Sequence, residues 1–364
     1  MLSLLDTVAL ALWSTITTRP LAGLLHALLD AGRTGPDPAL PGSLAGVLAC
    51  AGAAAPDTIV GTLRDQAAAA LARASAQGID VVPWSDPRYP PLLAAIPDPP
   101  VVIWIKGDAA SLVAPAVAIV GSRAASPYGL EAASRLACEL AEAGCAIVSG
   151  LARGVDSAAH RGALDGGGVT VGVLGSGLDV IYPPEHRGLA ARMIGRGALV
   201  SEYPPGTPPL KPYFPARNRV ISGLSLGVVV IEAAHRSGSL ITANRALEQG
   251  RHVMAVPGNI LSGRHRGSHA LLRDGALVVD GADDVLAELG ASSLRAVATR
   301  RSPSPDHDEV LRVMSAGESY DVDTLARETG LRPALLLPRL LDLELRGSIR
   351  RLAGGRFMRA ARTC

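Results

Sequence analysis

Short runs of consecutive apolar residues alternate with longer amphipathic stretches between about residues 101 and 290. A wholly apolar run of four to six residues is typical of a strand buried on both faces, as in a parallel sheet covered by helices. The expected strands are 101–106, 117–120, 146–149, 170–174, 198–201, 227–231, 252–256 and 276–279. The expected helices between them include 129–143, 157–164 and 240–249. We therefore predict an α/β fold with a Rossmann-like, mostly parallel sheet and helices on both faces.

The pattern changes on both sides of this central block. Residues 1–78 alternate apolar helical stretches with Gly/Pro breaks, which predicts a small helical domain. Its expected helices are 2–13, 20–30, 44–50 and 58–76, and a Pro-rich stretch at 83–100 separates it from the central domain, which we expect to cover 79–290.

The C-terminal part carries the pattern of a winged helix. Residues 291–307 are typical of a flexible linker, and residues 308–364 form the last domain. Its expected elements are helices at 308–315, 322–329 and 333–346, followed by a hairpin of strands 348–352 and 357–359 with a turn at Gly354-Gly355. Pro338 should kink the third of these helices.

Charge and composition exclude some classes of protein. The formal net charge is only +2, so the whole molecule is not a polycation. Of the 35 basic side chains only Lys106 and Lys211 are lysines. No apolar run is long enough to span a membrane, and Asp6 stands where a signal peptide would carry a basic residue, so we expect a cytoplasmic protein without membrane contact.

Gly- and Ser-containing loops follow several of the predicted strands. Gly121, Ser122 and Arg123 come after strand 117–120, where glycine permits close approach, the helix N-terminus favours an anion and Arg123 can clamp a phosphate. The Gly-x-Gly-x-x-Gly spacing of dinucleotide sites is missing, and a plain strand-to-helix turn is the alternative. The loop after strand 146–149 carries Arg153, with Asp156 placed to cap the next helix.

Since a third such loop occupies 175–187, and the carboxyl ends of parallel strands meet at one edge, these loops should line one crevice. Ser237, Gly238 and Ser239 form a further anion nest at the start of helix 240–249. We find no pattern for a zinc site, a cofactor, a nucleophile elbow or paired catalytic carboxylates, and expect a protein that is not an enzyme.

Residues 203–219 combine prolines, aromatic rings and cations. The segment is expected to begin extended and exposed, as its prolines require. Its last nine positions contain three cations, two aromatic rings and one amide: Lys211, Tyr213, Phe214, Arg217, Asn218 and Arg219. Single-stranded DNA stacks its bases on aromatic rings while cations follow the phosphates. The alternatives are aromatic rings that pin a Pro-rich loop to the core, and a solvated or ion-paired edge for Arg217 and Arg219.

Five sequence segments within this region resemble the DprA (Smf) family of bacterial DNA-processing proteins, and the resemblance extends over about 84–285. They are 118–123 (AIVGSR), 149–160 (SGLARGVDSAAH), 174–179 (LGSGLD), 214–223 (FPARNRVISG) and 237–243 (SGSLITA). The resemblance implies a role in natural transformation, in which single strands are protected and RecA recombinase is loaded onto them. It also implies a homodimer formed through the Rossmann-like domain, a SAM-like or helix-hairpin-helix N-terminal region and the C-terminal winged helix.

By the same resemblance the DNA-binding pocket falls on Arg123, Lys211 and Phe214, with Arg217 and Arg219 nearby as weaker candidates. One departure is that Gly267-Ser268-His269 stands where the family usually has Gly-Thr-Asn, which puts in doubt any family role of position 269.

Two other functions compete with single-strand binding. A phosphoribohydrolase of the LOG type would share the fold, but Ser237–Thr242 lacks the glutamate of that family's catalytic loop. Base release that depends on Glu232 would support this enzyme. A transcription factor built around the winged helix is the other alternative, and tight, sequence-specific duplex binding would support it.

Overall fold

The computed structural model describes residues 2–17, 44–50, 57–290, 309–315, 318–345, 348–352 and 355–359. The chain divides into two compact units, Met1–Arg295 and Ala296–Cys364. The predicted helix 20–30, the predicted linker 291–307 and Gly354 of the predicted turn lie outside the described residues.

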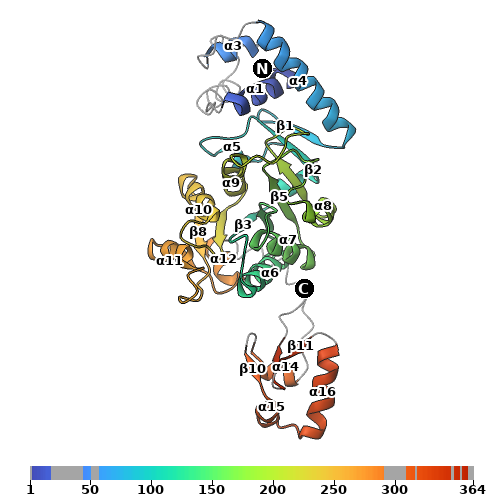
Figure 1. The fold of residues 1–364 in the computed structure, drawn as a ribbon, viewed down its shortest axis with the longest axis vertical. Helices are drawn as coiled ribbons and strands as arrows, with labels where there is room; N and C mark the ends of the chain where they lie inside the picture. Colours follow the sequence, from blue (N-terminus) through green and yellow to red (C-terminus); the bar gives the residue numbers. More distant parts are fainter. Residues whose placement is uncertain are drawn as a thin grey trace. The chain divides into compact units, whose positions relative to one another are not determined.

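A nine-stranded sheet forms the centre of the first unit (Figure 1). Its order is β1-β2-β6-β5-β4-β3-β7-β8-β9. The seven strands β6-β5-β4-β3-β7-β8-β9, in this spatial order, all pair in parallel with their neighbours. Strand β2 is antiparallel to both β1 and β6. The strands are β1 Asp80–Pro83, β2 Val102–Gly107, β3 Ala116–Val120, β4 Ala146–Ser149, β5 Thr170–Leu174, β6 Ala198–Ser201, β7 Gly227–Val230, β8 His252–Ala255 and β9 Leu277–Val278.

Helices cover both faces of this sheet, because its central strands alternate two sets of buried side chains. Val117 and Ile119 of β3 face a cluster built with α6, α7 and α12, whereas Ala118 and Val120 face a cluster built with α5, α8, α9 and α10. These helices are α5 Pro91–Ala94, α6 Pro127–Glu142, α7 Val155–Asp165, α8 Arg187–Ile194, α9 Tyr213–Gly223, α10 Gly238–Glu248 and α12 Ala282–Glu288; α11 is Arg266–Arg273. The predicted fold class is confirmed.

The strand order creates a crevice at β3. The chain runs from β3 outward through β4, β5 and β6, and then returns to place β7 on the other side of β3. The connections on the two sides of β3 therefore leave in opposite directions. A crevice beyond the carboxyl ends of such strands is the usual ligand site in open parallel sheets.

Three N-terminal helices lie next to β1 and β2 (Figure 1): α1 Leu4–Thr17, α3 Leu44–Cys50 and α4 Asp57–Ala76. Helices α1 and α4 contact β1, and α3 packs on α1 and α4. Arg64 of α4 binds Asp6 of α1 through two hydrogen bonds of 2.6 and 3.1 Å. Val8 and Trp13 belong to the same hydrophobic cluster as the sheet. The boundary expected at residue 78 therefore falls within a continuous core.

Two parts of the first unit differ from the sequence-based expectation. The Pro-rich stretch was expected to begin at 83 as a separator, but β1 ends there and pairs with β2. Residues 203–219 were expected to begin extended and exposed, but Tyr203 is buried, and α9 begins at Tyr213. Pro212 is the residue that caps this helix and Pro215 lies in its first turn, where a proline costs no hydrogen bond.

The second unit is a winged helix. Three helices, α14 Glu309–Val313, α15 Val322–Thr329 and α16 Pro333–Leu345, enclose a small core that includes Leu325, Leu336 and Phe357. The strands β10 Ser319–Tyr320, β11 Ile349–Arg351 and β12 Phe357–Arg359 form an antiparallel sheet in the order β10-β12-β11. Pro338 lies inside α16, as expected, on its exposed side.

Candidate nucleic-acid interface

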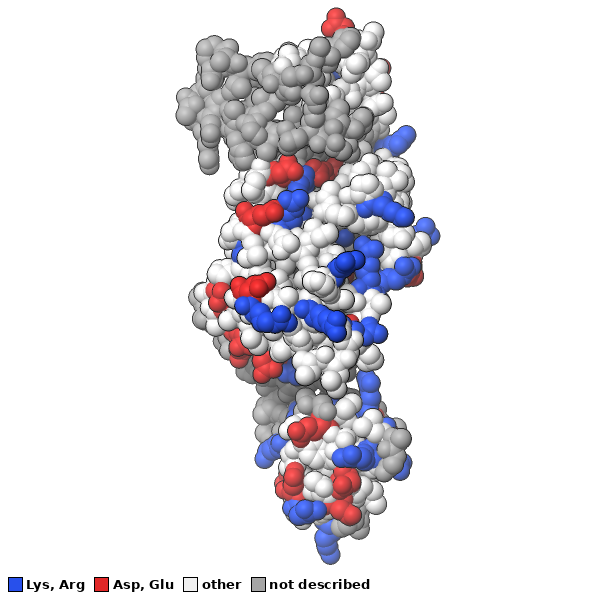
Figure 2. All heavy atoms as spheres, turned by 60° about the vertical axis from the view of Figure 1, so that its left-hand side comes forward, with Lys and Arg blue, Asp and Glu red and all other residues white. Residues whose placement is uncertain are grey.

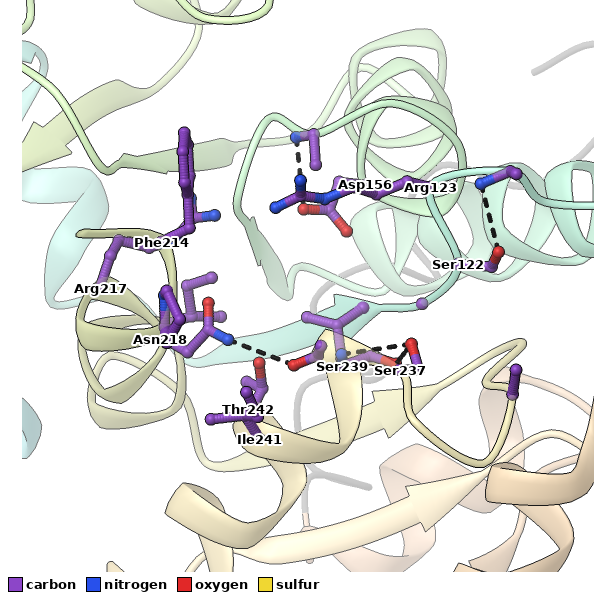
Figure 3. Close-up of a pocket in the computed structure, with 18 of the residues that line it drawn as sticks. Ser122, Arg123, Asp156, Phe214, Arg217, Asn218, Ser237, Ser239, Ile241 and Thr242 are labelled. Atoms are coloured by element: carbon purple, nitrogen blue, oxygen red, sulfur yellow. Dashed lines mark hydrogen bonds between the residues drawn. The ribbon is translucent and has the colours of Figure 1, made fainter. Parts of the chain in front are cut away.

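A cavity of about 740 Å³ opens at the carboxyl ends of β3 and β7 (Figure 3). Its walls come from the loop after β3, the loop after β4, the loop after β5, the start of α9 and the start of α10. The predicted convergence of strand-end loops is thus present. Of the ten candidate site residues, eight line the cavity: Gly121, Ser122, Arg123, Lys211, Phe214, Arg217, Gly238 and Ser239.

A cation and two aromatic rings form one side of the cavity. The Arg123 guanidinium lies 5.4 Å from the centre of the Phe214 ring, within cation–π range. The Phe214 ring lies 5.6 Å from that of Tyr182, tilted by 44°. Arg123 and Lys211 are exposed and Phe214 is half-buried, so their charges and the ring edge are open to a ligand. Neither cation has an acidic side chain as ion-pair partner among the described residues.

The N-terminus of α10 forms the opposite side. Ser237 caps the helix, and its Oγ lies 2.7 Å from the Ser239 Oγ and accepts a hydrogen bond from the Ser239 N–H. Asn218 of α9 reaches across and donates to the Gly238 carbonyl at 3.3 Å, which ties the two helices together. Hydroxyls at a helix N-terminus suit a phosphate oxygen.

Arg217, a weaker candidate for DNA binding, is buried and does not form the solvated or ion-paired edge that was the alternative. It is only 4% exposed, and its Nη1 donates to the carbonyls of Gly150 (2.7 Å) and Val173. Burial lowers the pKa of this guanidinium to about 10, against the attraction of Asp156. A side chain at Gly150 would collide with Arg217, because a Cβ there would lie 2.5 Å from the guanidinium. Arg217 therefore holds α9 against the ends of β4 and β5, and reaches the cavity only from its floor.

Asp156 was expected to cap α7, but Gly154 occupies the capping position. The Asp156 carboxylate turns back instead and accepts from the N–H groups of Gly150 (3.1 Å) and Ala152 (3.3 Å). Burial raises the pKa of this carboxyl, against the effect of Arg217 and of these two N–H groups. Asp156 thus stabilises the loop before its own helix.

Arg219 and Arg153 do not line the main cavity. Arg219 pairs with Asp98 (3.1 Å) and Glu202 (2.7 Å), so the ion-paired alternative describes it. Arg153 is exposed and pairs with Glu185 at 2.5 Å, beside a small recess next to the cavity.

Tyr182, Ile241 and Thr242 also line the cavity, although sequence reasoning did not select them. Tyr182 lies in the third predicted loop, and its place after a strand end was an available signal. Ile241 is 39% exposed on α10. Residues 267–269, which depart from the family's usual Gly-Thr-Asn, do not line the cavity. Ser268 accepts a hydrogen bond from the Ala233 N–H, and His269 Nε2 lies 3.1 Å from the Gly258 carbonyl.

The face of the protein drawn in Figure 2 carries both basic and acidic side chains. The described residues contain no group of three potential metal ligands. None of the described helices is long and apolar enough to cross a membrane.

Comparison with known proteins gives consistent matches. Residues 80–290 match the family DNA recombination-mediator protein A, and residues 295–355 match the DprA winged helix domain. The chain is 44% identical to Protein Smf of Escherichia coli over 294 residues, which is 78% of each chain. It is 49% identical over 203 residues to the DNA processing protein DprA of Streptococcus pneumoniae, covering 56% of this chain and 72% of that protein.

Two solved structures agree with this. The X-ray structure of DprA from S. pneumoniae superposes with a TM-score of 0.65 at 41% identity, covering 73% of this chain and 92% of that one. DNA processing protein A from Helicobacter pylori, a protein that binds single-stranded DNA, gives a TM-score of 0.53 at 30% identity, covering 58% and 96%. The chain therefore belongs to the DprA/Smf family of DNA recombination-mediator proteins and carries that family's winged-helix domain.

Proposed function

We propose that the cavity binds single-stranded DNA, and that the chain protects incoming single strands and loads RecA onto them during natural transformation. The observation that carries the proposal is that Arg123 lies against the Phe214 ring, with Lys211 lining the same cavity, across from the N-terminus of α10. Phosphates can contact the two cations while a base stacks on the ring. The single-strand binding of the H. pylori relative supports this assignment.

An enzymatic role has less support. Glu232, the acid whose loss would abolish base release in the phosphoribohydrolase alternative, is fully buried and does not line the cavity. Both its oxygens accept from Ser126, at distances from 2.6 to 3.3 Å, so it is engaged in holding the start of α6. Asp156, the acid that does line the cavity, is occupied by loop N–H groups. We propose a binding protein without catalytic activity.

From the family resemblance we propose a cytoplasmic homodimer that hands single strands to RecA. Sedimentation of the purified chain tests the dimer; a monomer at micromolar concentration would contradict it. RecA filament growth on coated single strands tests the hand-over, and growth that the chain does not accelerate would contradict it.

The salt dependence of oligo-dT binding tests the cavity. Arg123→Ala and Lys211→Ala should each weaken binding and reduce the slope of log K against log salt by about 0.7, because each loses one phosphate contact. Phe214→Leu should weaken binding with an unchanged slope, because stacking releases few ions, and the loss should not exceed the 1–3 kcal/mol, roughly, that replacing a stacking ring by alanine costs. Fluorescence anisotropy at several salt concentrations measures both quantities.

Lys106→Ala is the matched control, since Lys106 is the other lysine of the chain and does not line the cavity. It should bind like the parent. If Arg123→Ala, Lys211→Ala and Phe214→Leu also bind like the parent, the site is misplaced. Nucleoside monophosphate hydrolysis by the parent, lost in Glu232→Gln, would favour the enzyme instead.

A further inference from the structure

The loops at the crevice are of the kind that binds phosphate in many parallel α/β proteins. There, the backbone N–H groups after a strand and at the next helix N-terminus surround a di- or triphosphate. In this chain the corresponding N–H groups follow β3, β4 and β7. At two of these three positions the N–H groups already bind a carboxylate of the chain itself.

The first of these positions is the start of α6, after β3, where the carboxylate of Glu232 is bound. This carboxylate accepts from the N–H and the hydroxyl of Ser126, the residue that caps this helix. Gly129 leaves room for it, because a Cβ at that position would lie 2.6 Å from a Glu232 oxygen. Arg264 lies 3.6 Å away and balances its charge.

The second position is the loop after β4, where the carboxylate of Asp156 is bound. One carboxylate oxygen takes the N–H groups of both Gly150 and Ala152. The intervening Leu151 has a positive φ of 55°, the local conformation that turns successive N–H groups toward one anion. Asp156 is 7% exposed and lines the cavity, so a phosphate approaching this loop would meet a carboxylate where it needs donors.

The third position, the N-terminus of α10, holds no carboxylate among the described residues; hydroxyls of Ser237 and Ser239 are there instead. We propose that Asp156 is a specificity-determining residue, whose carboxylate fills the anion position at the end of β4. The cavity then accepts the single negative charge of each phosphodiester at Arg123, Lys211 and α10, and excludes the adjacent charges of free di- and triphosphates. This inference rests on the proposed function of the same cavity.

Asp156→Asn tests the inference and keeps the loop hydrogen bonds, because the amide oxygen can replace the one carboxylate oxygen that accepts both N–H groups. Since the buried Arg217 loses a negative neighbour in this variant, thermal unfolding of the variant serves as the control for its fold. We expect this variant to bind inorganic pyrophosphate about tenfold or more tighter than the parent, since one negative charge has left a buried position. Asp156→Ala, which also frees the two N–H groups, should bind pyrophosphate at least as tightly as Asp156→Asn. Calorimetric titration of the full chain with pyrophosphate measures both.

The control is Asp165→Asn, which removes the same charge from the exposed end of α7, where Asp165 pairs with Arg192 outside the cavity. It should bind pyrophosphate as weakly as the parent. The inference is overturned if Asp156→Asn binds pyrophosphate no tighter than Asp165→Asn, or if the parent already binds it as tightly as Asp156→Asn. A parallel oligo-dT titration separates the two proposals: a parent that does not bind oligo-dT refutes the proposed function, whereas the pyrophosphate comparison depends only on Asp156.

Discussion

Arg219 and Arg123 are both arginines near the crevice, and their surroundings give them different roles. The Arg219 side chain is 14% exposed and makes two ion pairs, whereas Arg123 is exposed above an aromatic ring. Burial alone would lower the pKa of Arg219, but Glu202 and Asp98 outweigh it and raise that pKa. An arginine held in this way is not available to a phosphate.

Arg219→Gln should therefore reduce stability and leave DNA binding intact. The variant leaves Glu202 and Asp98 without their cation, at a cost of about 2 kcal/mol, below that of a wholly buried pair because Asp98 is half exposed. Urea unfolding measures the cost, and oligo-dT anisotropy should give the parent's affinity and salt slope. A lowered salt slope would place Arg219 in the DNA site after all.

His160 offers a pH-dependent prediction on α7. Its Nδ1 lies 2.7 Å from the Thr170 hydroxyl, which itself donates to the Ile147 carbonyl, so His160 must donate and its buried Nε2 carries no proton. Burial, with smaller effects from His186 and Arg217, lowers the pKa of His160 from 6.5 to about 3. A depressed pKa contributes stability that is present above 6.5 and is lost as pH falls from 6.5 toward 3.

Between pH 7 and 5 this residue should cost the parent about 2 kcal/mol of unfolding free energy. His160→Asn can keep the donor to Thr170 but cannot titrate, so its stability should fall by that much less over the same range. Urea unfolding at the two pH values measures the difference. Equal losses in the parent and His160→Asn would contradict the predicted titration.

At the scale of elements, most strands were predictable and one functional helix was not. The eight expected strands were all found, and most of them are apolar runs buried in the sheet, whereas β1 was not expected and β9 is exposed. The crevice followed from parallel pairing, which brings strand ends to one edge. The helix α9 was missed because Pro212 and Pro215 suggest extended chain, although the first turn of a helix tolerates both.

The error in α9 changed the interpretation of its arginines. Interpreted as a loop, 213–219 gives no reason to place one arginine in the interior and the other at the surface. As a helix it has one buried face, and Arg217 lies on that face while Phe214 stays at the cavity. The sequence also could not reveal that Gly150 leaves space for the Arg217 guanidinium, since the two residues are 67 positions apart and meet only in the folded chain.

At the scale of the whole molecule, net charge contributes little to recognition. The chain carries 35 Lys and Arg against 33 Asp and Glu, so long-range attraction of DNA to the molecule as a whole is weak. Binding must then come from cations placed locally, of which Arg123 and Lys211 face the cavity. The small number of lysines makes this directly measurable.

The most direct test is protection of lysines from acetylation by bound oligo-dT, read by mass spectrometry of the full chain. Lys211 lines the cavity, and Lys106, the other lysine, lies at the end of β2 and serves as internal control. We predict that saturating oligo-dT strongly slows acetylation of Lys211 and leaves that of Lys106 unchanged. Unaltered reactivity of Lys211 in the DNA-bound chain would contradict the account.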